Sequence, residues 1–111
     1  MDAEVQEFKR CKLVKVKGRI DSSNAQEFQS VMETLTDGGN FKLVLDMTDI
    51  TFLSSRGWWV LVQTQKSCKR YNRGELVLAN IKSDIRESLD LVGLNLYFKI
   101  FDDTTGAVGH F

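Results

Sequence analysis

The sequence of 111 residues contains no proline, a single histidine and two cysteines, and its charges cancel. Fifteen basic and fifteen acidic side chains leave a formal net charge of zero, so no overall field attracts nucleic acid. No apolar run approaches the roughly 20 residues that a membrane-spanning helix needs. The lack of proline excludes nothing by itself. The other absences predict a protein that binds no nucleic acid and no membrane.

The cysteines and the acidic N-terminus indicate the compartment. Cys11 and Cys68 fit no metal-binding spacing, and residues 1–7 carry no secretory signal pattern. We therefore expect reduced, partly buried thiols in a cytoplasmic protein. The apolar fraction of 42% and the charged fraction of 27% are typical of an ordinary globular chain. A chain of this length can bury one core, so we expect a single domain over residues 1–111.

The chain lacks the groups that most enzymes need. A serine nucleophile requires a base, and the only histidine, His110, lies one residue from the C-terminus, where disorder is the default. There is no Gly-x-Ser-x-Gly turn and no glycine-rich phosphate loop. The acidic pairs Asp46/Asp49 and Asp102/Asp103 are more typical of strand-end aspartates that bind loop amides than of a Mg²⁺ site. We expect no catalytic residue, no metal and no cofactor.

Hydrophobic periodicity predicts an alternation of strands and helices. The predicted strands are 3–9, 12–17, 41–46, 75–79 and 98–101, and the predicted helices are 24–35, 55–71 and 83–92. Gly18 is predicted to end the second strand, and Ser23 with Gln26 has the spacing of a capping box. The segment 102–105 is predicted to cap a final helical turn. The order β-β-α-β-α-β-α-β predicts an α/β fold in which helices pack on a mixed sheet.

The segment from Asp46 to Trp59 carries the clearest functional signal. The apolar run 41–45, typical of a central strand, ends in Asp46 and leads through a polar turn to Ser54 and Ser55, where a helix begins. Free backbone amides and the helix dipole at such a position favour an added anion, including a phosphate carried by a serine. Serine is also a common N-cap, and we expect one of the two serines to cap this helix.

Two tryptophans follow the serines. Trp59 shares a helical stripe with polar and charged residues and is predicted to face solvent, whereas Trp58 is predicted on the buried side. An exposed tryptophan beside this loop is typical of a protein interface, and the alternative is that Trp59 folds flat onto the domain's own surface. The residues predicted to face the core are Val60, Leu61, Thr64, Cys68 and Tyr71 in this helix and Ile85, Leu89 and Val92 in the next.

Five segments, by their order and spacing, carry a resemblance to a known family. They are Val16–Asp21, Leu43–Ile50, Phe52–Gly57, Ile85–Leu94 and Tyr97–Asp102. Together they resemble the STAS domain family, which includes bacterial anti-sigma factor antagonists and related modules of stressosomes and anion transporters. The resemblance covers nearly the whole chain. It implies a STAS-type mixed β-sheet with helices packed on it.

The resemblance also implies phosphoacceptor candidates. The best-known members carry Asp-Ser-Ser-Gly or Asp-Ser-Thr-Gly at this junction, and a partner kinase phosphorylates the last hydroxyl before the glycine. Aligned on Gly57, that position is Arg56 here, and the preceding serine of the family matches Ser55. Many relatives have Ser-Ser-Ala-Gly instead. Ser55 is therefore the first candidate and Ser54 the second, with Arg56 either pairing with a phosphate on Ser55, blocking the acceptor position, or lying exposed without a role.

The implied function is regulatory. A STAS protein of this kind binds an anti-sigma factor or a GHKL-type serine kinase, and a PP2C-type phosphatase is a further implied partner. Around the two serines, the implied partner-binding surface comprises Asp21, Ser22, Arg56, Gly57 and Trp59.

Two other interpretations remain open at this point. One is a non-switching STAS scaffold in which Arg56 marks the loss of regulation and self-association, such as a weak homodimer, carries the function. The other is a small-ligand or nucleotide-binding module that uses the helix N-termini near Asp46 and Ser55.

Overall fold

The computed structural model describes all 111 residues. The strands are β1 (Asp2–Glu7), β2 (Lys12–Ile20), β3 (Lys42–Asp46), β4 (Ile50–Leu53), β5 (Glu75–Ala79) and β6 (Ile100–Phe101). The helices are α1 (Ala25–Asp37), α2 (Ser55–Lys69), α3 (Ser83–Leu91) and α4 (Thr104–Gly109), with a 3-10 turn η1 (Arg70–Asn72) after α2. The sheet order is β1-β2-β3-β5-β6, and β4 pairs with β2. The predicted mixed α/β fold is confirmed, with β1 antiparallel to β2 and all other pairs parallel.

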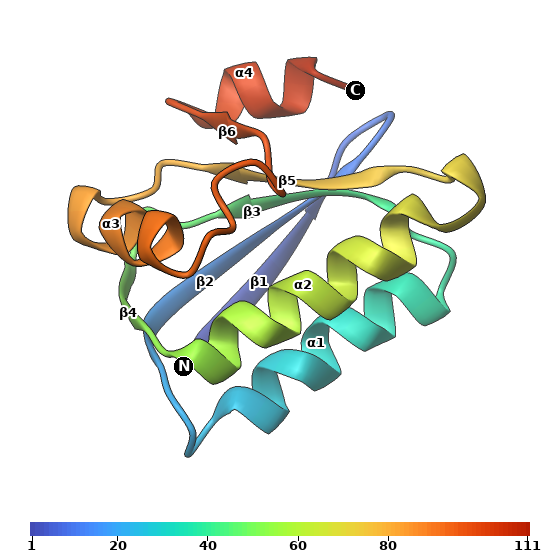
Figure 1. Ribbon diagram of the computed structural model, residues 1–111. Helices are drawn as coiled ribbons and strands as arrows, with labels where there is room; N and C mark the ends of the chain where they lie inside the picture. The colour runs from blue at the N-terminus through green and yellow to red at the C-terminus, as the bar shows by residue number, and fades with distance from the viewer.

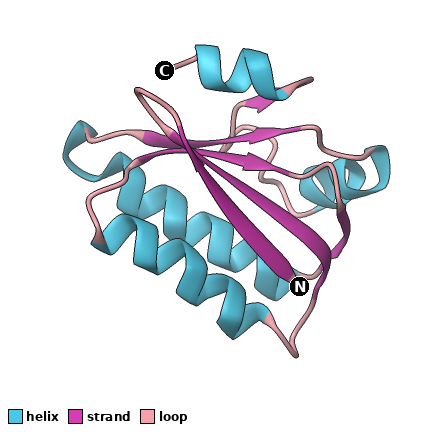
Figure 2. Cartoon of the chain, turned by 180° about the vertical axis from the view of Figure 1, so that it is seen from behind, coloured by secondary structure: helices cyan, strands magenta, loops and turns pink.

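The helices cover the two faces of the sheet unequally. Figure 1 shows α1 and α2 side by side on one face, with α3 beside them and α4 on the opposite face, and Figure 2 shows the same layers from behind. Successive strand residues alternate between the faces. In β3, Leu43 and Leu45 join the larger core under α1, α2 and α3, whereas Val44 joins the smaller core under α4. Both faces of the central strands are therefore buried, which explains their continuous apolar runs.

The prediction omitted one strand. The segment Ile50–Leu53 was expected to be a polar turn, but it forms β4, which pairs with the far end of β2. Gly18 was expected to end β2, and this was wrong as well. Its φ of +97° lies beside a register shift, after which β2 continues to Ile20 with β4 as its new partner. Glycine adopts this left-handed backbone conformation without a steric penalty, so the irregularity bends the strand without ending it.

Two predicted core residues are exposed. Tyr71 is 85% exposed because α2 ends at Lys69 and the following residues turn away, with Tyr71 itself at a φ of +57°. Val92 is 48% exposed because it follows the last residue of α3. The capping box was also wrong, since Asn24 is the N-cap of α1 and makes no side-chain capping bond. No helix is long and apolar enough to cross a lipid bilayer.

Candidate functional site

The pairing of β2 with β4 places two loops next to each other. Ile20 and Leu53, the last residues of these parallel strands, are register partners, and the amide of Ser54 donates to the carbonyl oxygen of Ile20 at 2.9 Å. The residues that follow each strand therefore leave the sheet at the same edge. This brings the Asp21 segment and the Ser54–Ser55 segment together although they are more than thirty positions apart in the sequence.

Ser54 caps helix α2. Its backbone is extended, with φ −76° and ψ 170°, and its hydroxyl oxygen accepts a hydrogen bond from the Gly57 amide at 3.3 Å. Its carbonyl oxygen accepts the first helical bond, from Trp58, at 3.0 Å. This satisfies one of the amide donors that every helix start leaves free. The prediction that one of the two serines caps this helix is confirmed, and the residue is Ser54.

Gly57 holds the helix against the two strands. A Cβ atom at this position would lie 2.3 Å from Leu53 Cδ1, closer than carbon atoms approach in folded proteins, and in tight contact with Ile20 Cγ2 at 3.1 Å. Gly57 and Leu53 are both buried, so the Leu53 side chain has little room to move aside. The absence of a side chain lets the first turn of α2 sit directly on the ends of β2 and β4.

Ser55 and Arg56, which lie between Ser54 and Gly57 in the sequence, are accessible to solvent. Both are exposed, and neither side chain has a hydrogen-bond or ion-pair partner in the chain. As the first two helical residues they also carry backbone amides without an intrahelical acceptor. No acidic side chain lies in this first turn. The start of α2 therefore offers free donors and the positive end of the helix dipole to an approaching anion.

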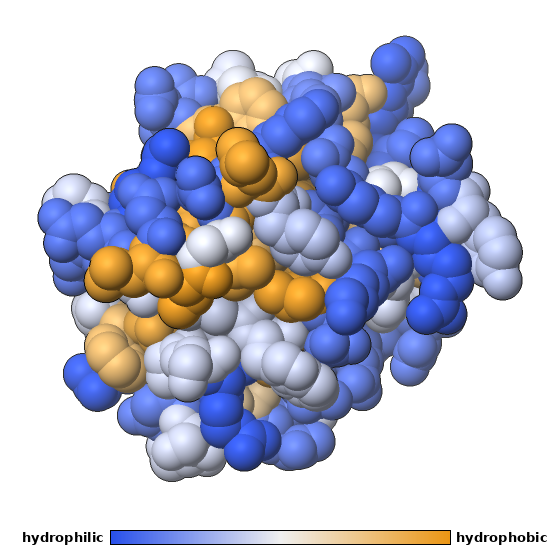
Figure 3. Space-filling model, in the orientation of Figure 1, coloured by the Kyte–Doolittle hydropathy of each residue, from blue (hydrophilic) through white to orange (hydrophobic).

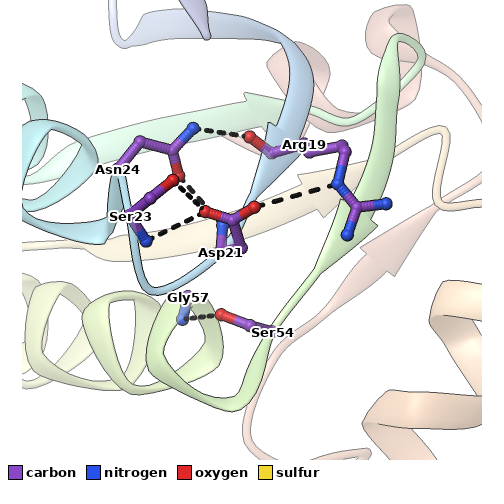
Figure 4. Close-up of polar contacts among 6 residues, drawn as sticks. All are labelled: Arg19, Asp21, Ser23, Asn24, Ser54 and Gly57. Atoms are coloured by element: carbon purple, nitrogen blue, oxygen red, sulfur yellow. Dashed lines mark hydrogen bonds and ion pairs between the residues drawn. The ribbon is translucent and has the colours of Figure 1, made fainter.

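The loop between β2 and α1 forms the other side of the site. Asp21 Oδ1 accepts from the hydroxyl of Ser23 at 2.5 Å and from its amide at 3.0 Å. Asn24 closes the loop, with its Nδ2 donating to the Arg19 carbonyl at 2.7 Å and its Oδ1 accepting from the Asp21 amide at 2.9 Å. Figure 4 shows this network beside the Ser54–Gly57 cap. The loop is internally fixed, and Ser22 at its tip is exposed.

The charge of Asp21 is stabilised within the same loop. The Ser23 hydroxyl bond is the largest contribution that lowers the pKa of the Asp21 carboxyl, and the Ser23 amide and the charge of Arg19 add to it. Arg19 Nε lies 3.8 Å from Asp21 Oδ2, and its guanidinium stacks 4.4 Å from the centroid of the Phe52 ring. The surface beside the serines thus carries one fixed negative charge and one fixed positive charge.

The tryptophans lie as predicted. Trp59 is 53% exposed and borders a shallow groove between α1 and α2, whereas Trp58 is 2% exposed. The Trp58 indole donates to Ser88 Oγ on α3 at 3.2 Å and packs near Phe98. Trp58 therefore ties the start of α2 to α3, and Trp59 remains available at the surface.

An exposed apolar patch lies at the end of α3. Leu91 and Leu96 are 87% and 95% exposed, and Val92 lies between them in sequence. Figure 3 shows apolar surface gathered over α3 and the loop that follows it. Trp58 and Ser88 connect this region to α2. The sequence did not reveal the patch, because Val92 was assigned to the core.

One aspartate of each predicted acidic pair, Asp46 and Asp103, holds the neighbouring backbone through hydrogen bonds. Asp46 Oδ1 accepts from the Thr48 amide, the Thr48 hydroxyl and Asn80 Nδ2 at 3.0, 2.5 and 3.0 Å. Burial alone raises the pKa of the Asp46 carboxyl, but these hydrogen bonds outweigh it and leave the pKa below its ordinary value. Asp103 caps α4 by accepting from the Gly106 amide at 2.7 Å. The interpretation as aspartates that bind loop amides is confirmed for Asp46, and Asp103 provides the predicted cap of the final helix.

The single histidine is remote from the serines. His110 Nε2 lies 2.7 Å from Glu75 Oε1, at the start of β5, and the ring packs against Phe101 and Phe111. The expectation of a disordered C-terminus is therefore wrong, because α4 and the Glu75 contact hold this end. No cluster of three metal-ligating side chains is present, and Cys11 and Cys68 are both free and buried. No cavity is lined by Ser54, Ser55 or Asp46.

Comparison with known proteins identifies the family. The family model of the STAS domain matches residues 2–107. BtrV of Bordetella bronchiseptica, named as an anti-sigma factor antagonist, is 27% identical over 96 residues, covering 86% of this chain and 82% of BtrV. A Thermotoga maritima protein with the same kind of name has a similar structure, with a TM-score of 0.90, 20% identity and coverage of 97% of this chain and 92% of that one. SpoIIAA of Bacillus, solved in its phosphorylated form, has a TM-score of 0.75, 13% identity and 98% coverage of both chains. The chain belongs to the STAS domain family.

Proposed function

We propose that this chain is an anti-sigma factor antagonist-like regulatory protein that binds an anti-sigma factor. The observation that carries the proposal is the meeting of two loops at one edge of the sheet, where exposed Ser22 and exposed Ser55 and Arg56 flank a rigid framework. Trp59 adds an exposed aromatic side chain, the type of residue that anchors protein interfaces. The proposed surface comprises Asp21, Ser22, Ser54, Ser55, Arg56 and Trp59, and Gly57, which was expected in it, is buried beneath it.

Ser55 is the proposed phosphoacceptor. Its hydroxyl is exposed and unpaired, and the free amides at the start of α2 lie beside it. A phosphate would bring about −1.5 to −2 charges to a loop whose own residues 54–57 carry only the positive charge of Arg56. That change weakens docking through charge repulsion and the cost of desolvating the phosphate.

Ser54 is the second candidate, and its geometry makes it a poorer acceptor. Its hydroxyl oxygen already accepts the Gly57 amide, and the side chain is only partly exposed. Phosphorylation there requires the capping bond to break before the hydroxyl can reach a kinase. Arg56 is close enough in sequence to pair with a phosphate on Ser55, which would hold the modified loop in one conformation.

The relatives support this assignment by their names. BtrV and the Thermotoga protein are named as anti-sigma factor antagonists, and SpoIIAA is known in unphosphorylated and phosphorylated forms. The kinase in our proposal is a GHKL-type serine kinase, which serves as the anti-sigma factor, and a PP2C-type phosphatase reverses the modification. These are regulatory roles, and the chain itself contributes a binding surface.

The test compares charge at two equivalent helix positions. Ser55→Asp and Ser83→Asp each place a carboxylate on the exposed first residue of a helix, α2 and α3 respectively. Binding of each variant, and of Ser55→Ala, to the GHKL-type kinases encoded in the same genome is measured by calorimetry. We expect Ser55→Asp alone to lose affinity. Equal affinity of all three variants for a kinase that binds the wild type would overturn the switch.

Arg56 favours a second candidate function, a non-switching STAS scaffold. It occupies the position that the acceptor hydroxyl takes in the best-known members, and it has no partner in this chain. Incubation with the binding kinase and ATP, followed by intact mass measurement, separates the two functions. One added phosphate that is lost in Ser55→Ala supports the switch. Binding without any added phosphate supports the scaffold, and sedimentation then tests for the weak homodimer.

A further inference from the structure

A second concave site lies at the other end of the sheet. Three loops that are distant in sequence surround a cavity of about 390 Å³: the β1–β2 hairpin at residues 7–12, the α1–β3 loop at 39–42, and Arg73 after α2. This size falls in the range of small-molecule pockets. The strands β3 and β5 begin here, whereas the proposed partner-binding surface follows the ends of β2 and β4. The two sites are therefore separate.

The cavity concentrates positive charge, although the net charge of the whole chain is zero. Five of its eleven lining residues are cationic and only Glu7 is acidic. The cationic residues are Lys9, Arg10, Lys12, Lys42 and Arg73. None of them has a carboxylate within salt-bridge distance. Unpaired like charges that converge on one concavity repel each other, so an anion bound there relieves the repulsion.

Arg73 is held in place at this cavity. Its guanidinium carbon lies 3.7 Å from the centroid of the Phe41 ring, and Nη2 donates to the Ser67 carbonyl oxygen at 2.6 Å. The buried Nε atom has no hydrogen-bond acceptor in the chain. A buried donor without an acceptor is uncommon in folded proteins. The fold thus fixes this side chain against an aromatic ring and leaves its positive charge without a carboxylate partner.

The helix dipoles oppose an anion here, but they are too weak to exclude it. Both α1 and α2 end at this side of the molecule, and a helix C-terminus carries about −0.5 elementary charge. The last carbonyls of α1 are already occupied, since Gly38, Gly39 and Asn40 donate to them. The two helix ends together contribute at most about one negative charge. Glu7 adds one more, and both are outweighed by the five cationic side chains.

The geometry points to a binding site for a small, multiply charged phosphate-bearing molecule. A planar guanidinium that is fixed on an aromatic ring matches the paired oxygens of a phosphate, and flexible lysines supply further charge. A diphosphate group brings several negative charges into one cavity, which a single carboxylate does not. The site is independent of the anti-sigma factor antagonist role.

The experiment uses the full chain labelled with ¹⁵N and titrated with inorganic pyrophosphate at low salt, followed by NMR. We expect saturable shifts confined to the amides of residues 8–12, 38–42 and 73–74. Arg10→Gln combined with Lys42→Gln removes two exposed charges of the cavity, and Lys82→Gln combined with Arg86→Gln removes two exposed charges of the α3 region. The first pair is expected to weaken binding at least about tenfold, and the second less than about twofold.

Further arms identify the ligand chemistry. Tighter binding of ATP than of pyrophosphate assigns the site to nucleoside phosphates, and equal binding assigns it to the phosphates alone. Arg73→Lys keeps the positive charge but loses the paired N–H donors of the planar guanidinium. We expect this variant, once its spectrum verifies the fold, to bind pyrophosphate more weakly. Equal weakening by both double variants, shifts spread over all basic residues, or citrate binding as tightly as pyrophosphate would each overturn the proposal.

Discussion

Gly57 and Leu53 are in such close contact that a methyl group on Gly57 would lie 2.3 Å from the Leu53 side chain. Leu53 is 5% exposed and belongs to the main core, so its side chain has little room to move away. The contact sets the distance between the end of β4 and the first turn of α2. The positions of Ser54, Ser55 and Arg56 in the proposed surface depend on it.

We expect Gly57→Ala to destabilise the fold by about 1–3 kcal/mol, because the added carbon forces Leu53 out of its packed position. Urea unfolding monitored by circular dichroism measures the change. Gly109→Ala is the matched control, since a Cβ at that helical glycine meets nothing within 4 Å. That variant is expected to be neutral or slightly stabilising. Equal stability of both variants would show that the Leu53 contact relaxes without cost.

The two serines are expected to respond differently to removal of the hydroxyl. Ser54→Ala loses the capping bond to Gly57 and should lower the free energy of unfolding by about 1 kcal/mol. Ser55→Ala loses a hydroxyl that has no partner, and we expect no measurable loss of stability. Thermal unfolding of the two variants side by side makes the comparison. A larger loss in Ser55→Ala would contradict the assignment of Ser54 as the N-cap.

The sequence predicts the elements whose burial repeats regularly. The strand at 75–79 has the predicted bounds, because both faces of β5 are buried and the apolar run is continuous. Strand β4 was missed for the opposite reason. Its middle residues, Thr51 and Phe52, are exposed, and its pairing depends on the irregularity at Gly18, which no local pattern reveals. A four-residue strand with half its residues exposed is indistinguishable from a turn until its partner is known.

The candidate site was also predictable from the sequence only in part. The serine pair at a helix start follows from the local motif, and so does the exposure of Trp59. The choice of Ser54 as the cap could not be predicted, because either serine fits the motif. The network of Arg19, Asp21 and Asn24 depends on how β2 ends, and the cationic cavity joins three distant loops. Such groupings come from tertiary structure alone.

Gln65 is a polar residue buried in the core, and its hydrogen bonds are expected to contribute strongly to the stability of the fold. Its carboxamide accepts from the Leu76 amide at 2.7 Å and donates to the carbonyl oxygens of Leu76 and Tyr97 at 2.9 and 3.1 Å. Gln65→Leu leaves the buried Leu76 amide without an acceptor, and we expect a loss of about 2–3 kcal/mol. Gln63→Leu on the same helix removes a partly exposed side chain without hydrogen bonds and should change stability by less than about 0.5 kcal/mol. Chemical denaturation of both variants measures the difference.

Acid is expected to weaken the fold through Asp46. Its pKa in the folded chain lies below the ordinary 3.8, so the carboxylate stabilises the fold above that pH. This contribution is lost as the pH falls below 3.8 and the folded-state carboxyl takes up a proton. We expect Asp46→Asn to be less stable than the wild type at pH 6, with the difference shrinking toward pH 3.

Unfolding free energies across this pH range give the comparison. Thr48→Ala removes one donor to the Asp46 carboxylate and serves as a second variant, with a smaller loss at pH 6 and the same convergence in acid. A difference between Asp46→Asn and the wild type that stays constant with pH would contradict the assignment of the lowered pKa to folded-state hydrogen bonds.

The two thiols are expected to resist modification in the folded chain, and to different degrees. Burial raises the pKa of Cys68 to about 12, and the side chain is 0% exposed, so almost no thiolate forms near pH 8. Burial also raises the pKa of Cys11, but this residue lines the cationic cavity and is 6% exposed. Since the thiolate is the reactive form, labelling by Ellman's reagent should be slow at Cys11 and should wait for unfolding at Cys68.

Ser55→Cys supplies an exposed thiol that we expect to react at once. Fast labelling of Cys68 in native buffer would show that α2 opens away from the sheet, and the core described above would then be less tightly closed than its packing indicates.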